Sequence, residues 1–294
     1  LDENFASQIP ADTQGTDQGQ LDREPEVQAH TEGVYGGKYL KHSLKFGNYN
    51  SIRQLIVDIS ERRGLGDLLA ESSRAAEQLP PEAGDYLTEI KGLPQSDPHD
   101  PRYIKSFALG LAVASRGADH LRNRPTLDIL GLPKELTTKI YGSEVNPDPT
   151  VYETKEHVVY FSENIFAVVD CLGVCKFICH GFNSPHLLKY EQFAGLIEAV
   201  TGWQVDVGEL EAVGKRVVDL ERMLNQRLGL SKADDTLPKR YFTEPMPDGT
   251  TKGHRILQEE FTSLLERYYT LRHWDGDGQV SSERRAEIER EVVL

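Results

Sequence analysis

A nine-residue segment, Val169–Phe177 (VDCLGVCKF), carries an acid, a glycine and two cysteines at the end of an apolar stretch. Asp170 is a carboxylate at the edge of a segment expected to be buried, so it needs hydrogen-bond donors. The N–H groups on the edge of a pterin ring would provide them. Gly173 has no side chain, so a planar ligand could approach the backbone there. The thiolate of Cys175 is a soft ligand suited to an iron–sulfur cluster.

A structural interpretation of the cysteines competes with this one. Cys171, Cys175 and Cys179 are the three cysteines of the chain, and their spacing of four residues would place them on one face of a helix as small apolar side chains. Three cysteines cannot complete a four-cysteine cluster. They also lie too close together for the disulfide framework of a secreted protein, so metal binding or burial is favoured.

Apolar residues at helical spacing predict the elements that position these groups. A helix rich in small residues is expected over 104–115, where another backbone or a flat cofactor could come close. A buried helix should run over 158–169 into the cysteines. Further helices are expected over 52–59, 67–79, 190–200, 210–228 and 256–274, and a short strand over 86–92. No run of alternating strands indicates a parallel sheet, so the predicted fold is mainly α.

The composition limits the class of protein. The 294 residues are 38% hydrophobic and 27% charged, which is typical of a globular chain with a core. The net charge of -14 argues against nucleic-acid binding, which needs clustered Lys and Arg. No stretch approaches the roughly 20 apolar residues of a membrane span, and we expect a cytoplasmic protein. The start at Leu1 indicates a fragment or a processed product.

Two segments resemble the aldehyde:ferredoxin oxidoreductase family. The pattern Asp-x-x-Gly-x-Cys at 170–175, followed by Lys-Phe, is similar to that family's second pterin-binding motif. The resemblance implies that Asp170 holds the pterin, that Gly173 and the backbone of Val174 lie beside it, and that Cys175 is the last of four ligands to a [4Fe-4S] cluster.

The second segment resembles the family's Asp-Pro-Arg loop, here at 100–102, and its Ser/Asn-Arg-Gly-x-x-His-Leu-Arg/Lys segment, here at 115–122. In that family the histidine lies near the metal and is proposed to handle protons, a role that falls to His120. Histidine suits this role because it titrates near neutral pH. Arg122 would contact the cofactor, where a guanidinium can neutralise a phosphate. Without the surrounding pattern, His120 would be interpreted as a structural residue.

Weaker similarities extend the resemblance to roughly residues 44 to 280, with matches at 46–49, 64–71, 91–93 and 274–278. The implied fold is mainly α, with two packed helical domains like the C-terminal part of the family's enzymes. We expect a polar lead-in or insertion at 1–38, a partial middle helical domain at 39–97 and a C-terminal helical domain at 98–294. The last would carry the pterin and cluster motifs.

The function implied is oxidation of an aldehyde or related oxo compound to the acid with a tungsto- or molybdopterin. Electrons would pass through the [4Fe-4S] cluster to ferredoxin or a similar carrier. The family's first three cluster cysteines, its first pterin motif and its N-terminal β domain are missing from this chain. The upstream half of the enzyme, or a separate N-terminal chain, would have to supply them. The alternative is a non-catalytic helical scaffold or binding subunit that kept the fold.

The remaining candidate ligands receive no firm role. Cys171 and Cys179 are additional to the core motif, and we expect both to be buried. His180 and His186 follow closely, but their spacing matches no zinc pattern, so a place along a substrate funnel is the other hypothesis. His99 is expected to be a surface or hinge residue. The acidic loop that starts at Asp275 lacks the final glutamate of a calcium-binding EF-hand.

Overall fold

The computed structural model describes residues 48–78, 81–96, 100–125, 132–179 and 188–292. The chain forms two compact units, Leu1–Leu79 and Pro80–Leu294. The division into domains at residue 97 stays a prediction, and the segment just before residue 97 belongs to the second compact unit. The expected lead-in at 1–38 lies outside the described residues.

The described part of the first unit is a helix followed by two shorter turns of helix. α4 (Tyr49–Ser60) is N-capped by Asn48, whose side chain accepts a hydrogen bond from the backbone N–H of Ser51. α5 (Leu65–Leu69) packs closely on it, since a Cβ added at Gly66 would lie 2.2 Å from the backbone of Asp58. Ile56 on α4 is 60% exposed, so the apolar stripe that predicted this helix is not buried along its whole length.

The single helix expected over 67–79 is wrong. α5 ends at Leu69, and a 3₁₀ helix, η4 (Ser72–Gln78), follows it. The break occurs at Ser72, which has a φ of 56°. A left-handed residue interrupts the hydrogen bonding of an α-helix, whatever the apolar spacing on either side.

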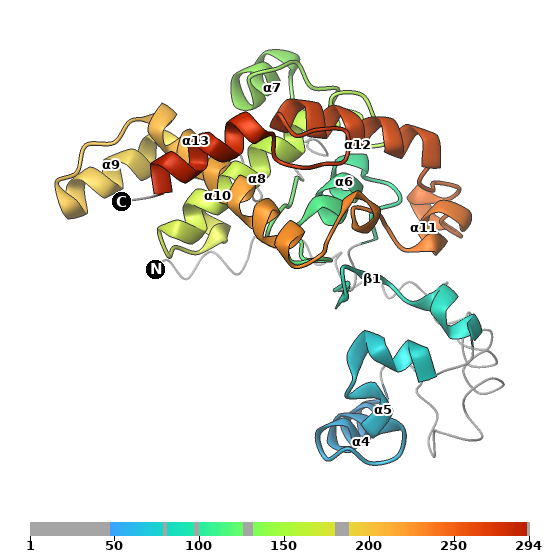
Figure 1. The fold of residues 1–294 in the computed structure, drawn as a ribbon. Helices are drawn as coiled ribbons and strands as arrows, with labels where there is room; N and C mark the ends of the chain where they lie inside the picture. The colour runs from blue at the N-terminus through green and yellow to red at the C-terminus, as the bar shows by residue number, and fades with distance from the viewer. Residues whose placement is uncertain (1–47, 79–80, 97–99, 126–131, 180–187, 293–294) are drawn as a thin grey trace, which may run out of the picture. The chain divides into compact units, whose positions relative to one another are not determined.

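The second unit is helical apart from one small hairpin among its described residues, which confirms the mainly α prediction (Figure 1). The hairpin pairs β1 (Glu89–Ile90) with β2 (Leu93–Pro94). The α-helices are α6 (Lys105–Val113), α7 (Lys134–Tyr141), α8 (Lys155–Cys171), α9 (Tyr190–Thr201), α10 (Val207–Arg227), α11 (Lys239–Thr243), α12 (Gln258–Arg272) and α13 (Ser282–Val292). The 3₁₀ helices are η5 (Pro81–Tyr86), η7 (Lys176–Ile178), η8 (Lys232–Asp234) and η9 (Gly249–Thr251).

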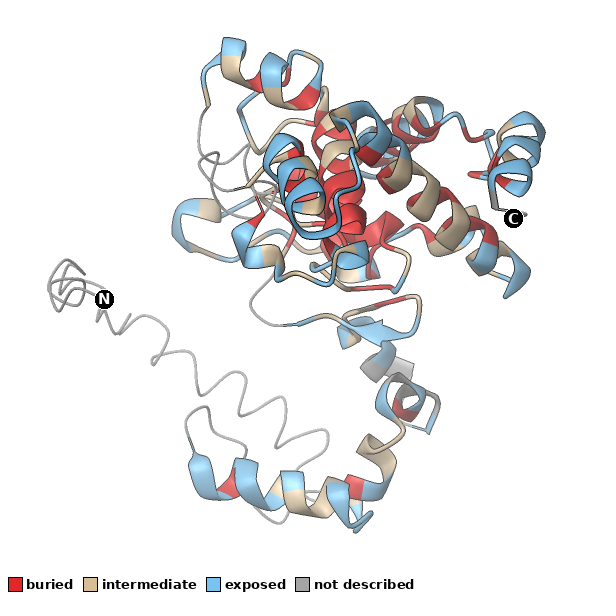
Figure 2. Ribbon diagram, turned by 90° about the vertical axis from the view of Figure 1, so that its left-hand side faces the viewer, coloured by how far each residue is buried: buried red, intermediate tan, exposed pale blue. Residues whose placement is uncertain are grey.

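The core of this unit is built around α6 and α8. Every residue of α6 is buried, and α8 packs against α6, α10 and α12 (labelled in Figure 1). The buried residues gather in the interior of this unit (red in Figure 2). The α8–α10 contact depends on Gly214, because a Cβ there would lie 2.4 Å from the carbonyl oxygen of Asn164. No described helix is long and apolar enough to cross a membrane.

Three ion pairs with buried carboxylates link the elements around this core. The guanidinium of Arg272 on α12 lies 2.5 Å from the carboxylate of Glu163 on α8. On α10, Arg222 lies 2.7 Å from Asp235, and Asp219 lies 2.8 Å from Arg284 of α13. Breaking a buried pair by removing one partner leaves an uncompensated charge and is strongly destabilising. These pairs therefore fix how α10 lies against its neighbours.

Candidate functional site

The Asp-x-x-Gly-x-Cys motif forms the turn that ends α8. Gly173 has a φ of 67°, a conformation that favours glycine, and the backbone N–H of Val174 donates to the carbonyl of Val169. The turn leaves Cys175 exposed just before η7. A Cβ at Gly173 would meet nothing within 4 Å, so the space beside this backbone is open.

Arg122 joins the second sequence motif to the first. It lies in the loop after α6, and its guanidinium donates to Oδ2 of Asp170 at the end of α8. Its other terminal nitrogen lies 2.5 Å from both carboxylate oxygens of Glu221 on α10. Lys176 approaches the same Asp170 from η7, with 2.6 Å between Nζ and Oδ1. Two positive and two negative side chains thus form one cluster where α8, η7, α10 and the loop after α6 meet.

The cluster lies at the boundary between core and surface. The side chain of Arg122 is 8% exposed, whereas those of Asp170 and Glu221 are 38% and 31% exposed. Burial opposes the charge of the guanidinium, but the carboxylates of Glu221 and Asp170 together raise the pKa of Arg122. Arg122 is therefore a permanent cation, and it could be offered to an anionic group such as a phosphate.

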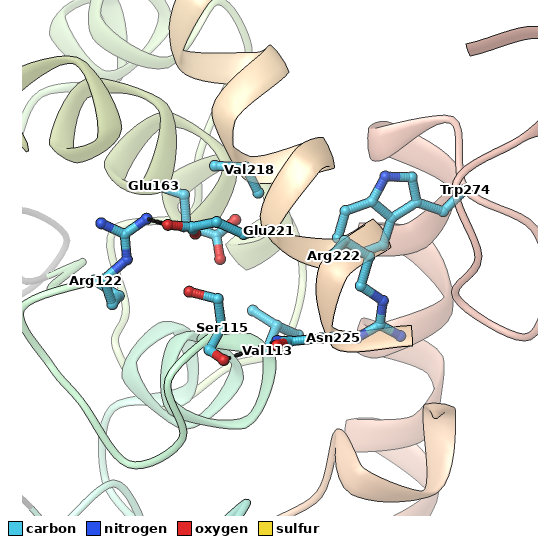
Figure 3. Close-up of a pocket in the computed structure, with 9 residues that line it drawn as sticks. All are labelled: Val113, Ser115, Arg122, Glu163, Val218, Glu221, Arg222, Asn225 and Trp274. Carbon is cyan, nitrogen blue, oxygen red and sulfur yellow. Dashed lines mark hydrogen bonds and ion pairs between the residues drawn. The ribbon is translucent and has the colours of Figure 1, made fainter. Parts of the chain in front are cut away.

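A small polar pocket opens beside the cluster, between α6, α8 and α10 (Figure 3). Arg122 and Glu221 face each other on one side of it, and Asn225 on α10 donates to the carbonyl of Ser115, 2.8 Å away. The pocket is lined by Val113, Ser115, Arg122, Glu163, Val218, Glu221, Arg222, Asn225 and Trp274. The hydrogen bond from Asn225 fixes the start of the loop that carries Arg122.

His120 lies two residues before Arg122 and is half-buried. Its ring nitrogen Nδ1 is 3.2 Å from the hydroxyl of Ser96, a residue just beyond the β1–β2 hairpin. The structure therefore joins Arg122 to the end of α8 and joins His120 to the hairpin segment.

The placement and burial of the three cysteines differ from the prediction. α8 ends at Cys171, so the three do not share one helix face. Cys179 is buried, as expected, but Cys171 is exposed and the prediction of its burial was wrong. The last turn of α8 buries Val168 and Val169 and leaves Asp170 and Cys171 on its exposed side. Partial desolvation of the Cys171 thiol and the nearby carboxylate of Asp170 raise its pKa.

The described residues fit the groups that the motifs imply. Asp170 presents an accessible carboxylate, Gly173 leaves open space at the backbone, and Arg122 provides a fixed positive charge. Cys175 could bind one iron of a cluster, since its thiol is exposed. No group of three or more His, Cys, Asp or Glu side chains able to hold a metal ion occurs in the described parts of the chain. The other ligands of a cluster would have to come from elsewhere.

Three residues of the site were not predicted from the sequence: Glu221, Lys176 and Ser96. Glu221 lies on a helix whose acidic residues all look solvent-exposed in the sequence, so no signal singles it out. Lys176 is part of the Lys-Phe pair after the motif, and this position could have suggested its contact with Asp170. The candidates His99, His180 and His186 lie outside the described residues.

Comparison with known proteins identifies relatives along most of the chain. The family model described as aldehyde ferredoxin oxidoreductase, domains 2 and 3, matches residues 27–289. The tungsten-containing aldehyde ferredoxin oxidoreductase of Pyrococcus furiosus is 33% identical over 250 residues, which are 83% of this chain and 37% of that protein. The corresponding protein of Pyrococcus horikoshii is 31% identical over 255 residues, 85% of this chain and 38% of the relative.

Two further similarities are more distant. The WOR-like subunit of the aliphatic sulfonate oxidoreductase of Pyrococcus furiosus is 25% identical over 259 residues, 86% of this chain and 36% of that subunit. The active-site complex of benzoyl coenzyme A reductase with 1,5-dienoyl-CoA matches with a TM-score of 0.62 and 21% identity, over 92% of this chain and 43% of that chain. The latter likeness concerns the fold alone. The chain spans less than two fifths of the length of these curated relatives.

Proposed function

The chain belongs to the aldehyde ferredoxin oxidoreductase family, and we propose that it forms the part of a tungsten–pterin oxidoreductase that holds one side of the cofactor. The complete enzyme would oxidise an aldehyde, or a related oxo compound, to the acid. Two electrons would leave through a [4Fe-4S] cluster to ferredoxin or a similar carrier. The rest of the enzyme would supply the other three cluster cysteines. Tungsten is favoured over molybdenum because the similar proteins are named as tungsten-containing.

One observation carries this proposal: Arg122 and Asp170 come from separate motifs, 48 residues apart, and form a direct ion pair. A scaffold that had lost its ligand would have no need to keep a half-exposed carboxylate and a buried guanidinium together at an open glycine turn. The pair places one hydrogen-bond acceptor and one cation side by side. This is the combination needed for a ligand that has both ring N–H groups and phosphates.

Each residue of the site has a distinct task in this proposal. When bound, the tungsten–pterin group supplies the two-electron chemistry by which aldehyde and water give acid, two protons and two electrons. Asp170 would accept hydrogen bonds from the pterin ring, beside the open backbone of Gly173 and Val174. Arg122 would contact a phosphate, and Cys175 would bind one cluster iron. His120 would accept a proton as the acid forms.

The test is elemental analysis of the whole protein, purified with the part that completes the length of its relatives. We expect tungsten together with about four irons per protein. Cys175→Ala should lose iron, whereas Cys171→Ala should retain it. Cys171 is a matched control because it is exposed and lies in the same turn. A folded whole protein without metal would refute the proposal and favour the scaffold alternative, and unchanged iron in Cys175→Ala would remove the role assigned to that residue.

A further inference from the structure

The β1–β2 hairpin has no assigned role in the proposed function, although its backbone conformation is well defined. Its turn consists of Lys91 and Gly92, with φ values of 51° and 76°, as in the two-residue turns that match the twist of paired strands. The backbone N–H of Gln95 donates to the carbonyl of Thr88, 2.8 Å away, and extends the pairing beyond β2. Ser96 is the next residue, so the ladder fixes where its backbone lies.

Two side chains attach this hairpin to the body of the second unit. Lys91 is 2% exposed, and its ammonium lies 2.9 Å from the buried carboxylate of Asp235 and donates to the carbonyl of Ala112 on α6. The hydroxyl of Tyr241 on α11 lies 3.0 Å from Oε1 of Gln95 and donates to it. A buried charge pair is costly to break, so the hairpin is held in one position rather than free to swing.

The loop that carries His120 rests against the same hairpin. Gly117 has a φ of 94°, and a Cβ at this position would lie 2.2 Å from the carbonyl oxygen of Ile90 and 2.9 Å from Cβ of Leu93. No side chain fits between loop and hairpin. The two segments are therefore in backbone contact, and the distance between Ser96 and His120 is set by both.

We propose that Ser96 is the positioning residue for His120, with its hydroxyl accepting a hydrogen bond from Nδ1–H and thereby fixing the ring's orientation and tautomer. A neutral imidazole carries one N–H, so a proton on Nδ1 leaves the lone pair on Nε2. Nε2 is then the nitrogen that takes the proton from the reacting group. The proposal rests on the proposed function of His120 as proton acceptor. A serine hydroxyl can also donate, and donation to Nδ1 would give the opposite tautomer.

The tautomer can be measured without the cofactor, by ¹⁵N NMR of the histidine side chains in the full chain at a pH where His120 is neutral. His120→Gln identifies the signal. We expect the Nδ1–H form in the wild type, a mixture richer in Nε2–H in Ser96→Ala, and recovery of the Nδ1–H form in Ser96→Thr. Ser282→Ala, an exposed serine at the start of α13, should change nothing. An Nε2–H wild type, or no change in Ser96→Ala, would overturn the proposal.

Turnover of the whole enzyme gives a separate readout. Ser96→Ala should lower kcat by about tenfold, a fraction of the 10²–10⁴ that a general acid or base contributes, with KM and tungsten content unchanged. Ser96→Thr should restore most of the loss. Full activity in His120→Ala would refute the proton role of His120, while the tautomer measurement would still decide whether Ser96 positions the ring.

Discussion

Glu221 and Asp170 both pair with Arg122, and the structure predicts that Glu221 contributes mainly to folding stability and Asp170 mainly to cofactor binding. Glu221→Gln should destabilise the folded chain, because Glu221 accepts two charge-assisted contacts of 2.5 Å from a guanidinium that is only 8% exposed. A hydrogen bond between charged groups contributes about 1.5–3 kcal/mol. Glutamine keeps one acceptor but not the charge, so we take the lower end, about 1.5 kcal/mol.

Asp170→Asn should cost less in folding and more in cofactor binding. Asp170 is more exposed than Glu221, so solvent weakens its ion pairs with Arg122 and Lys176, and exposed pairs contribute about 0–1 kcal/mol. Asparagine also keeps an acceptor for Arg122. Its amide N–H₂ would, however, face the ring N–H groups that the carboxylate is proposed to bind, so tungsten occupancy should fall.

Thermal unfolding of the full chain and tungsten analysis of the whole protein separate the two effects. For a domain of about 200 residues, 1.5 kcal/mol corresponds to roughly 3–6 °C in Tm. Glu221→Gln should lower Tm by about that amount and leave the tungsten content unchanged. Asp170→Asn should lower Tm by less than half as much, but its tungsten content should fall. Glu198→Gln, on the exposed face of α9, is the control. If Asp170→Asn lowered Tm more than Glu221→Gln, Asp170 rather than Glu221 would be the structural anchor of Arg122, and the prediction would be refuted.

Two further predictions concern stability. Burial lowers the pKa of Lys105 from 10.5 to about 8, so between these pH values the unfolded chain binds more protons than the folded chain and the free energy of unfolding should rise with pH. Urea unfolding at pH 7.5 and 9.5 should show a larger rise for the wild type than for Lys105→Met. Equal rises would contradict this. Gly117→Ala should cost well over 2 kcal/mol, since a left-handed φ is combined with a clash at the carbonyl of Ile90. Gly142→Ala, with a φ of 68° and open space, should cost only the strain, and equal losses in the two variants would refute the clash.

Helices with a continuous apolar stripe could be predicted from the sequence because burial of that stripe creates the pattern. α6, α8, α9, α10 and α12 all lie within a few residues of their expected ranges. α7, α11 and α13 were not predicted, since short or highly charged helices carry little apolar periodicity. The break after α5 depends on the left-handed backbone conformation of Ser72, which the apolar periodicity of the sequence does not predict.

The candidate site could be predicted only for residues that are close in the sequence, where residue type and spacing indicate their role. Asp170, Gly173 and Cys175 occupy one turn, so their proximity follows from the sequence. The pairing of Arg122 with Asp170 depends on how the loop after α6 meets the end of α8, and that is decided by tertiary packing. Glu221 could not be found at all, because its role follows from the rotation of α10 about its own axis.

That rotation is fixed by contacts on more than one face of α10. Gly214 allows the backbone of α10 to touch that of α8, which sets the separation of the two helices. Asp219 and Arg222 bind partners on α13 and after η8, so a turn of the helix about its axis would break two buried ion pairs at once. Glu221 follows Gly214 by about two helical turns, so it lies on the face of α10 that meets α8, where Arg122 pairs with Asp170. The buried charges of this unit thus serve the site indirectly, because they determine which face of α10 meets it.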